Sequence, residues 1–194
     1  MSWSRVDEPE RAADRLLDVA ETVFADLGPA RATVSDVARA AGCSRQTVHR
    51  YFATGDALRL AFVERESRSI QAKVATRLIG IDDPVEMIVT AALAAVDEVA
   101  SRPALRRWFE PDAVGTTVSV SKASGTIAAG VADLWTRAGR TVGREPHSEH
   151  DRATAVDGLR RLMLSLLTDP PPSRDHTERL VRAMVVPMLL ADSR

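Results

Sequence analysis

Residues 33–52 contain the feature that most restricts the fold, two short helical stretches with a glycine between them. Thr33 and Ser44 can each cap the start of a helix with a side-chain oxygen, and Gly42 can adopt the positive φ of a tight turn. Four apolar residues fall on the facing sides of the two stretches, namely Val37, Ala41, Val48 and Tyr51. The spacing therefore predicts a helix-turn-helix.

The rest of the chain shows the same helical periodicity. Apolar residues recur at three- and four-residue spacing, and glycine or proline interrupts each run. Ala, Leu and Arg are abundant and aromatic residues make up only 4%, which favours helices over strands. The expected helices cover about residues 8–27, 34–41, 44–52, 56–80, 82–99, 103–111, 112–140, 151–168 and 174–190. The chain is therefore predicted to be all-α, with about nine helices.

Composition excludes several classes of protein. Lys and Arg number 26 and Asp and Glu 27, so the net charge of −1 excludes a globally basic nucleic-acid coat. A hydrophobic content of 45% is too high for a disordered chain, and no apolar run approaches the roughly 18 residues of a membrane span. The first residues lack the apolar core of a signal peptide, and the single cysteine, Cys43, allows no internal disulfide. These observations predict a soluble, cytoplasmic globular protein.

The second helix of the helix-turn-helix carries polar side chains on its outer face. These side chains are Arg45, Gln46, Thr47, His49 and Arg50. Arginine pairs with guanine, glutamine with adenine, and threonine with polar base edges or the thymine methyl group. Residues 31–52 also hold four arginines against one aspartate, a local excess of three positive charges in a nearly neutral chain. The segment therefore predicts DNA binding through this helix.

The chain resembles the TetR family of bacterial repressors in its DNA-binding signature. The matching residues are Thr33, Val37-Ala38, Ala41-Gly42-Cys43-Ser44, Val48-His49-Arg50-Tyr51-Phe52 and Asp56-Ala57-Leu58. The resemblance covers about residues 15–60. It implies a homodimer, with a three-helix DNA-binding domain over residues 1–55 and a larger ligand-binding and dimerisation domain over residues 56–194. It also implies that the long helix after Gly55 links the two domains and transmits ligand binding.

Two positions depart from the family's pattern. The family usually has tyrosine where this chain has His49 and lysine where it has Gly55, and both of those residues typically contact the DNA backbone. His49 can still donate a hydrogen bond, whereas Gly55 cannot. Thr33 and Thr54, near helix starts, are further predicted phosphate contacts. The complete set of predicted DNA-binding residues is Thr33, Ser44, Arg45, Gln46, Thr47, His49, Arg50, Tyr51 and Thr54.

Two features of the C-terminal region have alternative interpretations. Four large side chains either line an apolar ligand pocket or belong to the ordinary core. These side chains are Met87, Trp108, Phe109 and Trp135. The last two helices, at about 151–168 and 174–190, are amphipathic and either complete the monomer core or pair with a twofold mate as a four-helix bundle. The resemblance favours a homodimer through these helices.

The sequence holds no convincing motif for catalysis or cofactor binding. His147, His150 and Asp151 have the spacing of a metal site but fit a polar loop better. Glu110 and Asp112 fit helix caps better than an acid–base pair. Nucleophile elbows, phosphate-binding glycine loops and dinucleotide fingerprints are not found. We therefore predict no enzyme activity, no cofactor and no metal site.

The sequence as a whole favours a ligand-responsive transcriptional regulator. It predicts a repressor that binds a pseudo-palindromic DNA operator as a dimer and is released by a small-molecule effector. One alternative is a small-molecule-binding helical protein or enzyme in which the helix-turn-helix is only scaffold. Another is a family member that has lost its DNA affinity and acts through protein partners, an alternative to which Gly55 points.

Overall fold

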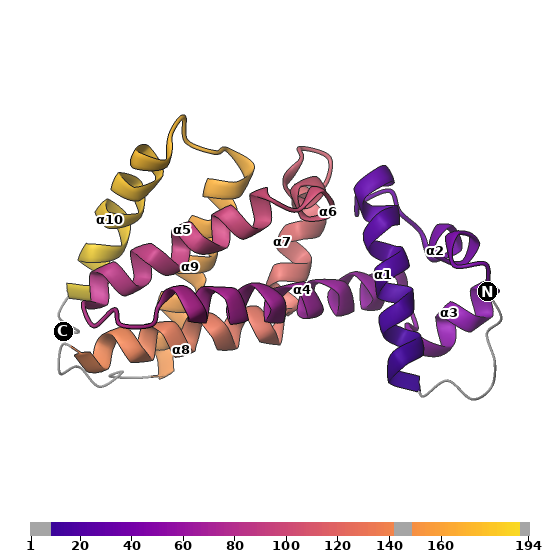
Figure 1. Cartoon of the computed structure of the whole chain (residues 1–194), viewed down its shortest axis with the longest axis horizontal. Coiled ribbons are helices and arrows are strands. Elements are labelled where there is room, and N and C mark those ends of the chain that lie inside the picture. Colours follow the sequence, from indigo (N-terminus) through magenta and orange to yellow (C-terminus); the bar gives the residue numbers. More distant parts are fainter. Residues whose placement is uncertain (1–8, 142–148, 191–194) are drawn as a thin grey trace. The chain divides into compact units, whose positions relative to one another are not determined.

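The computed structural model describes residues 9–141 and 149–190. These residues form ten α-helices and one short 3-10 helix, and no strand is found among them (Figure 1). The elements are α1 (Pro9–Leu27), α2 (Val34–Ala40), α3 (Arg45–Tyr51), α4 (Gly55–Arg77), α5 (Pro84–Ala100), α6 (Pro103–Arg106), the 3-10 helix η1 (Arg107–Phe109), α7 (Val114–Ala123), α8 (Gly125–Thr141), α9 (Glu149–Thr168) and α10 (Arg174–Leu190). The predicted all-α fold is therefore confirmed. None of the described helices is long and apolar enough to cross a membrane.

The single helix predicted over residues 112–140 is wrong, and the structure divides it into α7 and α8 at Ser124. Ser124 ends α7 with an extended backbone, at φ −75° and ψ 111°. Its side chain is almost fully buried, and its hydroxyl donates a hydrogen bond to Glu64 Oε1 at 2.8 Å. Because a buried hydroxyl needs such a partner, the contact with Glu64 favours a break that local spacing does not reveal.

The described helices pack into two compact units. Of the described residues, the first unit contains 9–66 and 102–124, and the second contains 67–101, 125–141 and 149–190. Helix α4 contributes residues to both units. The functional division after residue 55 stays a prediction, since packing and function need not divide at the same residue.

Three aromatic side chains from different elements form the centre of the first unit. Phe62 of α4 lies 5.0 Å from Phe24 of α1 and 6.0 Å from Trp108 of η1, measured between ring centroids. Phe24 and Trp108 are 5.5 Å apart in an edge-on arrangement, and all three side chains are almost completely buried. The Thr117 hydroxyl donates to the Trp108 carbonyl and so ties α7 to this cluster. Residues far apart in the sequence therefore build one core.

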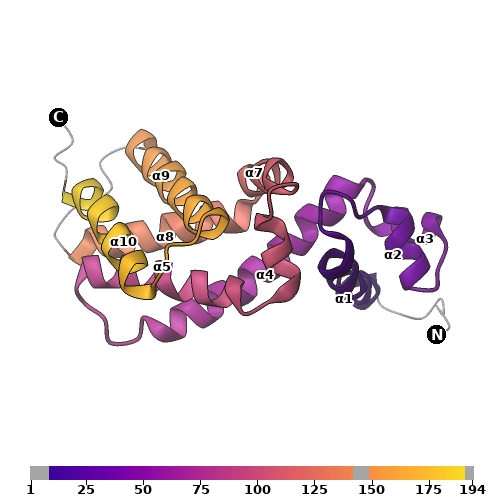
Figure 2. The ribbon, with the colours of Figure 1, turned by 90° about the horizontal axis from the view of Figure 1, so that it is seen from above.

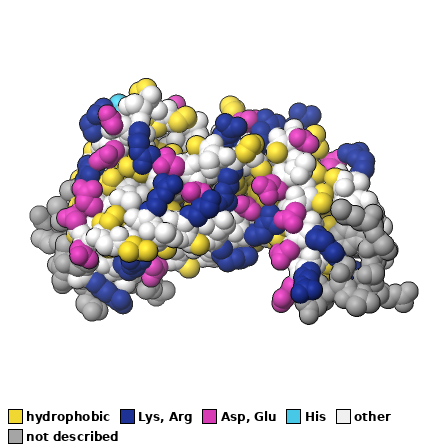
Figure 3. All heavy atoms as spheres, in the orientation of Figure 1, with side chains coloured by type: hydrophobic (Ala, Val, Ile, Leu, Met, Phe, Trp, Pro, Cys, Tyr) yellow, Lys and Arg dark blue, Asp and Glu magenta, His cyan; other side chains and the backbone are white. Residues whose placement is uncertain are grey.

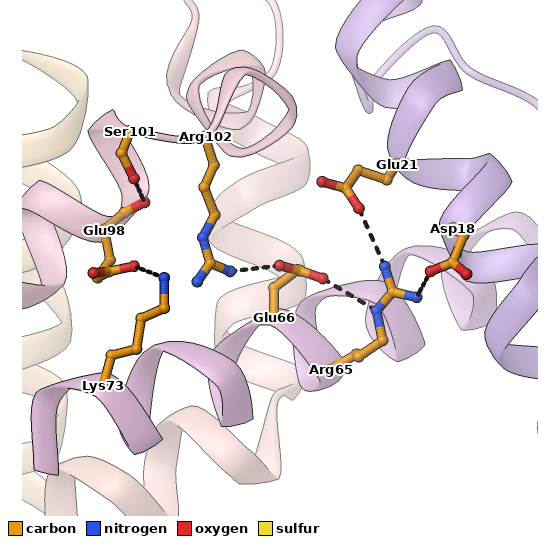
Figure 4. A network of polar contacts seen from close by, with 8 residues as sticks. All are labelled: Asp18, Glu21, Arg65, Glu66, Lys73, Glu98, Ser101 and Arg102. Atoms are coloured by element: carbon orange, nitrogen blue, oxygen red, sulfur yellow. Dashed lines mark hydrogen bonds and ion pairs between the residues drawn. The ribbon is translucent and has the colours of Figure 1, made fainter. Parts of the chain in front are cut away.

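Ion pairs join α1, α4 and the residue before α6 within the first unit (Figure 4). Arg65 of α4 reaches α1, with Nη1 2.7 Å from Asp18 Oδ1 and Nη2 3.5 Å from Glu21 Oε2. The neighbouring Glu66 is buried, and its carboxylate lies 2.7 Å from Arg102 Nη1 and 3.1 Å from Arg65 Nε. Glu66 thus accepts charge-assisted hydrogen bonds from two arginines.

Helix α5 is the centre of the second unit and contacts α8, α9 and α10 (Figures 1 and 2). Its buried face packs against apolar residues of these three helices. Arg174 of α10 places Nη1 2.7 Å from both carboxylate oxygens of Asp97 of α5. Gly130 of α8 leaves room for the Gln71 side chain of α4, since a Cβ there would lie 2.3 Å from Gln71 Nε2. The second unit is therefore a separate helical bundle with its own core.

Gly42 in the helix-turn-helix has φ +64°, a conformation that residues with a Cβ rarely adopt. A Cβ at this position would meet nothing within 4 Å, so backbone strain alone opposes substitution. We expect Gly42→Ala to lower the free energy of unfolding by about 1 kcal/mol. Urea unfolding followed by circular dichroism measures the change. Gly115→Ala in α7 is the control, since Gly115 has no positive φ and a Cβ there would also meet nothing within 4 Å. An equal loss of unfolding free energy in both variants would contradict the strain argument.

Candidate nucleic-acid interface

Helix α2 begins at a reciprocal cap formed by Thr33 and Asp36. The Thr33 hydroxyl accepts a hydrogen bond from the Asp36 amide at 3.2 Å, and the Asp36 carboxylate accepts one from the Thr33 amide at 3.0 Å. The Thr33 hydroxyl also donates to Asp36 Oδ2 at 2.6 Å. These bonds from Thr33 hold the pKa of Asp36 below its ordinary value. The N-cap predicted at Thr33 is therefore present, and both hydrogen-bond donors of Thr33 are directed at Asp36.

The turn between α2 and α3 has the predicted geometry. Gly42 supplies the positive φ, and the amide of Cys43 then donates to the Ala38 carbonyl at 3.0 Å. Val37 of α2 and Val48 of α3 are completely buried, and the two helices contact each other. The Cys43 thiol is half-buried, and desolvation raises its pKa. The turn and the two valines together fix α3 against α2.

Helix α3 presents polar side chains on its outer surface. Ser44 caps the helix, because its hydroxyl accepts a hydrogen bond from the Thr47 amide at 3.0 Å. The predicted DNA-binding side chains of α3 divide into the exposed Arg45, Gln46 and Arg50 and the half-buried Thr47, His49 and Tyr51. One short helix and its cap therefore bring together seven of the nine predicted residues, although their contacts with DNA stay predictions.

His49 is hydrogen-bonded on both sides of its ring. Its Nε2 lies 3.0 Å from Nε of Arg45, one turn earlier on α3. Its Nδ1 lies 3.0 Å from the carbonyl oxygen of Ala53, beyond the end of the helix. The ring therefore bridges the outer surface of α3 and the connection to α4.

Arg50 and Tyr51 form a second contact at the end of α3. Arg50 Nη2 donates to the Tyr51 hydroxyl at 2.9 Å, and the guanidinium carbon lies 4.9 Å from the centroid of the tyrosine ring. Tyr51 thus stabilises the positive charge of Arg50 through a hydrogen bond to its hydroxyl and a cation–π contact with its ring. Because the Tyr51 hydroxyl is the acceptor of this bond, it can still donate a hydrogen bond to an acceptor such as a phosphate.

Arg59 of α4 fixes the loop before α2, a role that the sequence did not predict. Its Nε donates to the Pro29 carbonyl at 2.7 Å and its Nη2 to the Ala32 carbonyl at 2.9 Å. Gly55 makes room for this guanidinium, because a Cβ at residue 55 would lie 3.1 Å from Arg59 Nη1. Thr54 caps α4 by accepting a hydrogen bond from a first-turn amide at 3.0 Å. A larger residue at position 55 would therefore require a small shift of this guanidinium.

Positive charge gathers at the helix-turn-helix although the whole chain is nearly neutral. Arg31, Arg39, Arg45 and Arg50 are all exposed. Asp36, the one acidic residue of that segment, lies 2.5 Å from Arg39 Nη2. By contrast, basic and acidic side chains are interspersed on the face drawn in Figure 3. The local excess of positive charge suits a polyanion such as DNA.

The four predicted pocket residues do not come together in one place. Trp108 belongs to the aromatic core of the first unit, and Phe109 is half-buried beside it in η1. Met87 is buried in the core of the second unit, and Trp135 packs against that core. Their role in ligand binding stays a prediction, but only Met87 and Trp135 share a core.

The metal-like cluster at His147, His150 and Asp151 lies outside the residues whose side chains the structure describes. Among the described residues, no group of three or more His, Cys, Asp and Glu side chains could hold a metal ion. Glu110 forms an ion pair with Arg107.

The fold and the geometry of α2 and α3 define a helix-turn-helix DNA-binding protein. The model of the family described as bacterial regulatory proteins, tetR family, matches residues 16–62. An uncharacterized HTH-type transcriptional regulator of Mycobacterium tuberculosis H37Rv, Rv1255c, is 31% identical over 187 residues, which cover 96% of this chain and 90% of the relative. The chain therefore belongs to the TetR family of bacterial transcriptional regulators, as its sequence indicated.

Solved structures share the fold over almost the whole chain. A TetR-family transcriptional regulator from Pectobacterium atrosepticum has a TM-score of 0.66 at 17% identity, over 98% of this chain and 100% of that chain. The transcriptional regulator FadR from Bacillus subtilis, in complex with stearoyl-CoA, has a TM-score of 0.60 at 10% identity, over 93% of this chain and 99% of that chain. At these identities the similarity concerns the fold alone.

Proposed function

We propose that this member of the family is a repressor that binds a pseudo-palindromic operator as a homodimer and is released by a small-molecule effector. It acts in the cytoplasm and performs no catalysis. The observation that carries the proposal is the polar outer surface of α3, capped by Ser44 and fixed by the Gly42 turn. Its exposed Arg45 and Arg50 are suited to pair with guanine or phosphate.

The last helix supports the proposed homodimer. Val181 and Val185 of α10 are completely buried in the second unit. Leu180 and Met184 of the same helix are 36% and 51% exposed, so α10 also has apolar side chains outside the monomer core. Burying them against a twofold mate is favourable. A twofold dimer also supplies two copies of α3, as adjacent major grooves of a pseudo-palindrome require.

The effector is proposed to bind in the second unit, where Met87 and Trp135 lie. Acyl-CoA thioesters are the first compounds to screen, because the structurally similar FadR is described in complex with stearoyl-CoA. An effector lowers DNA affinity only if it binds more tightly to a dimer whose α3 helices no longer match adjacent grooves. Trp108 and Phe109 stay predicted pocket residues that lie outside this unit.

Fluorescence anisotropy with an operator selected from a random DNA pool tests the proposal. The protein is expected to bind the selected duplex about 1,000-fold more tightly than a scrambled duplex, with an affinity that falls steeply as salt rises. Arg50→Ala is expected to weaken operator binding about 10-fold, because it removes a charge that faces the DNA. Arg137→Ala is the control, since Arg137 is an exposed arginine of α8 in the second unit, and it is expected to bind as the unsubstituted protein does.

Two outcomes would contradict the proposal. Equal affinity for the selected and the scrambled duplex would mean that α3 reads no sequence. Turnover of a small molecule, together with no DNA binding at low salt, would favour the alternative of an enzyme or carrier with a scaffold helix-turn-helix. An unchanged circular dichroism spectrum of Arg50→Ala is required, so that lost binding reports the side chain and not the fold.

A further inference from the structure

The contact between Arg45 and His49 determines where the proton of the imidazole lies. The Nε of arginine always carries a hydrogen and can only donate, so His49 Nε2 is the acceptor at 3.0 Å. In the neutral ring the proton is then on Nδ1, which donates to the Ala53 carbonyl at 3.0 Å. Both ring nitrogens of His49 are therefore engaged within the protein.

This arrangement removes the donor that a phosphate contact from His49 would need. The one N–H group of the neutral ring is directed at Ala53 and not at the DNA side. The ring is half-buried, whereas the side chain of Arg45 beside it is exposed. His49 thus lacks the free hydroxyl that a tyrosine at this position would present to a phosphate.

The same contact determines which edge of Arg45 is free. A guanidinium can pair with O6 and N7 of guanine through two adjacent N–H groups, either Nε with Nη2 or Nη1 with Nη2. The first edge is engaged, because Nε donates to His49. Nη1 and Nη2 of Arg45 make no hydrogen bond or ion pair with any residue that the structure describes. The Nη1–Nη2 edge therefore stays available to a base.

We propose that His49 is a positioning residue, which holds Arg45 so that its Nη1–Nη2 edge pairs with a guanine of the operator and which makes no DNA contact itself. The inference rests on the proposed function. Residues four apart lie above one another on a helix, so the ring supports the arginine from one turn away. The bond to Ala53 in turn fixes the ring. Holding the arginine before DNA binds reduces the side-chain freedom lost on binding and so favours discrimination at that base pair.

Two substitutions of similar size separate the two hydrogen bonds of His49. In His49→Gln, the side-chain oxygen Oε1 is as many bonds from Cβ as Nε2 is, so it can still accept from Arg45. In His49→Asn, the amide nitrogen Nδ2 is as many bonds from Cβ as Nδ1 is, so it can donate to Ala53. The acceptor Oδ1 of that asparagine is one bond closer to Cβ than Nε2 is, so it does not reach Arg45. Arg45→Ala and the double variant Arg45→Ala/His49→Asn complete a double-mutant cycle.

Anisotropy is measured with the selected operator and with duplexes in which one base pair at a time is replaced. Arg45→Ala is expected to lose about 10-fold discrimination at one G·C pair. His49→Asn is expected to lose roughly 5-fold at that same pair, whereas His49→Gln retains the discrimination. In the Arg45→Ala background, His49→Asn is expected to change affinity no further, because its effect passes through the guanidinium.

Different results contradict this inference and the proposed function. If the unsubstituted protein binds selectively but His49→Asn weakens binding equally with and without Arg45, then His49 acts independently and the positioning role is wrong. If His49→Asn retained the discrimination and His49→Gln lost it, His49 would act through its hydrogen bond to Ala53. That result would also contradict the proposal. If the unsubstituted protein shows no sequence preference, the proposed function itself fails, and this inference fails with it.

Discussion

Replacing Phe62 with alanine is expected to lower the free energy of unfolding by about 3–5 kcal/mol, the range for large-to-small changes at buried aromatic residues. Phe62 is completely buried and contacts both Phe24 and Trp108, so its removal leaves a cavity where three elements meet. The neighbouring rings can fill that space only in part, because α1 and η1 are also held by other contacts. This side chain is therefore expected to have one of the largest effects in the first unit.

The fluorescence of Trp108 reports this unfolding directly. The chain has three tryptophans, and Trp108 is the one that remains when Trp3 and Trp135 are replaced by phenylalanine. Urea unfolding at a fixed protein concentration then compares Phe62→Ala with Phe62→Leu, which keeps most of the volume and is expected to lose less than half as much stability. Equal losses in the two variants would show that the cavity is not the cause.

Glu66→Ala is the second change with a large expected effect, a loss of about 2–3 kcal/mol in the free energy of unfolding. Glu66 is buried and accepts hydrogen bonds from Arg65 and Arg102. Its removal takes a charged partner from two arginines whose side chains are only 21% and 17% exposed. Because water reaches these guanidinium groups poorly, it replaces the lost carboxylate only in part.

An exposed ion pair in the same unit is the control for Glu66→Ala. Arg39 is 77% exposed and pairs with Asp36 on α2. Arg39→Ala is expected to change the free energy of unfolding by no more than about 0.5 kcal/mol, since exposed pairs are weak. Urea unfolding of both variants under identical conditions gives the comparison. A loss for Glu66→Ala as small as that for Arg39→Ala would mean that the buried carboxylate contributes little to the first unit.

The parts of the structure that the sequence predicted well depend on neighbouring residues. Thr33 and Ser44 each cap a helix through the amide three residues later, and Gly42 supplies the positive φ that the turn needs. The burial of Val37 and Val48 follows from helical periodicity. Such short-range chemistry is visible in a single sequence. The caps, the turn and the burial of the two valines were therefore predictable, whereas Ala41 and Tyr51 of the predicted seam are only half-buried.

The parts that the sequence did not predict depend on contacts between distant segments. The break between α7 and α8 at Ser124 is accompanied by a hydrogen bond from Ser124 to Glu64. The burial of Trp108 depends on its contacts with Phe24 and Phe62. Periodicity carries no information on such pairs, because it describes one helix at a time. The Arg45–His49 contact was missed for another reason, since it depends on the rotamers of two outward side chains and not on their spacing alone.

The first unit is assembled from two separated stretches of the chain, and this affects how chimeric regulators can be made. A fragment that ends at Glu66 would lack Trp108 and Arg102, which complete its core and its ion-pair network. Exchanging the unit between relatives therefore requires three junctions, near residues 66, 101 and 124, rather than one. Substitutions confined to α3 cross none of these junctions, so under the proposed function they are the simpler route to a new operator preference.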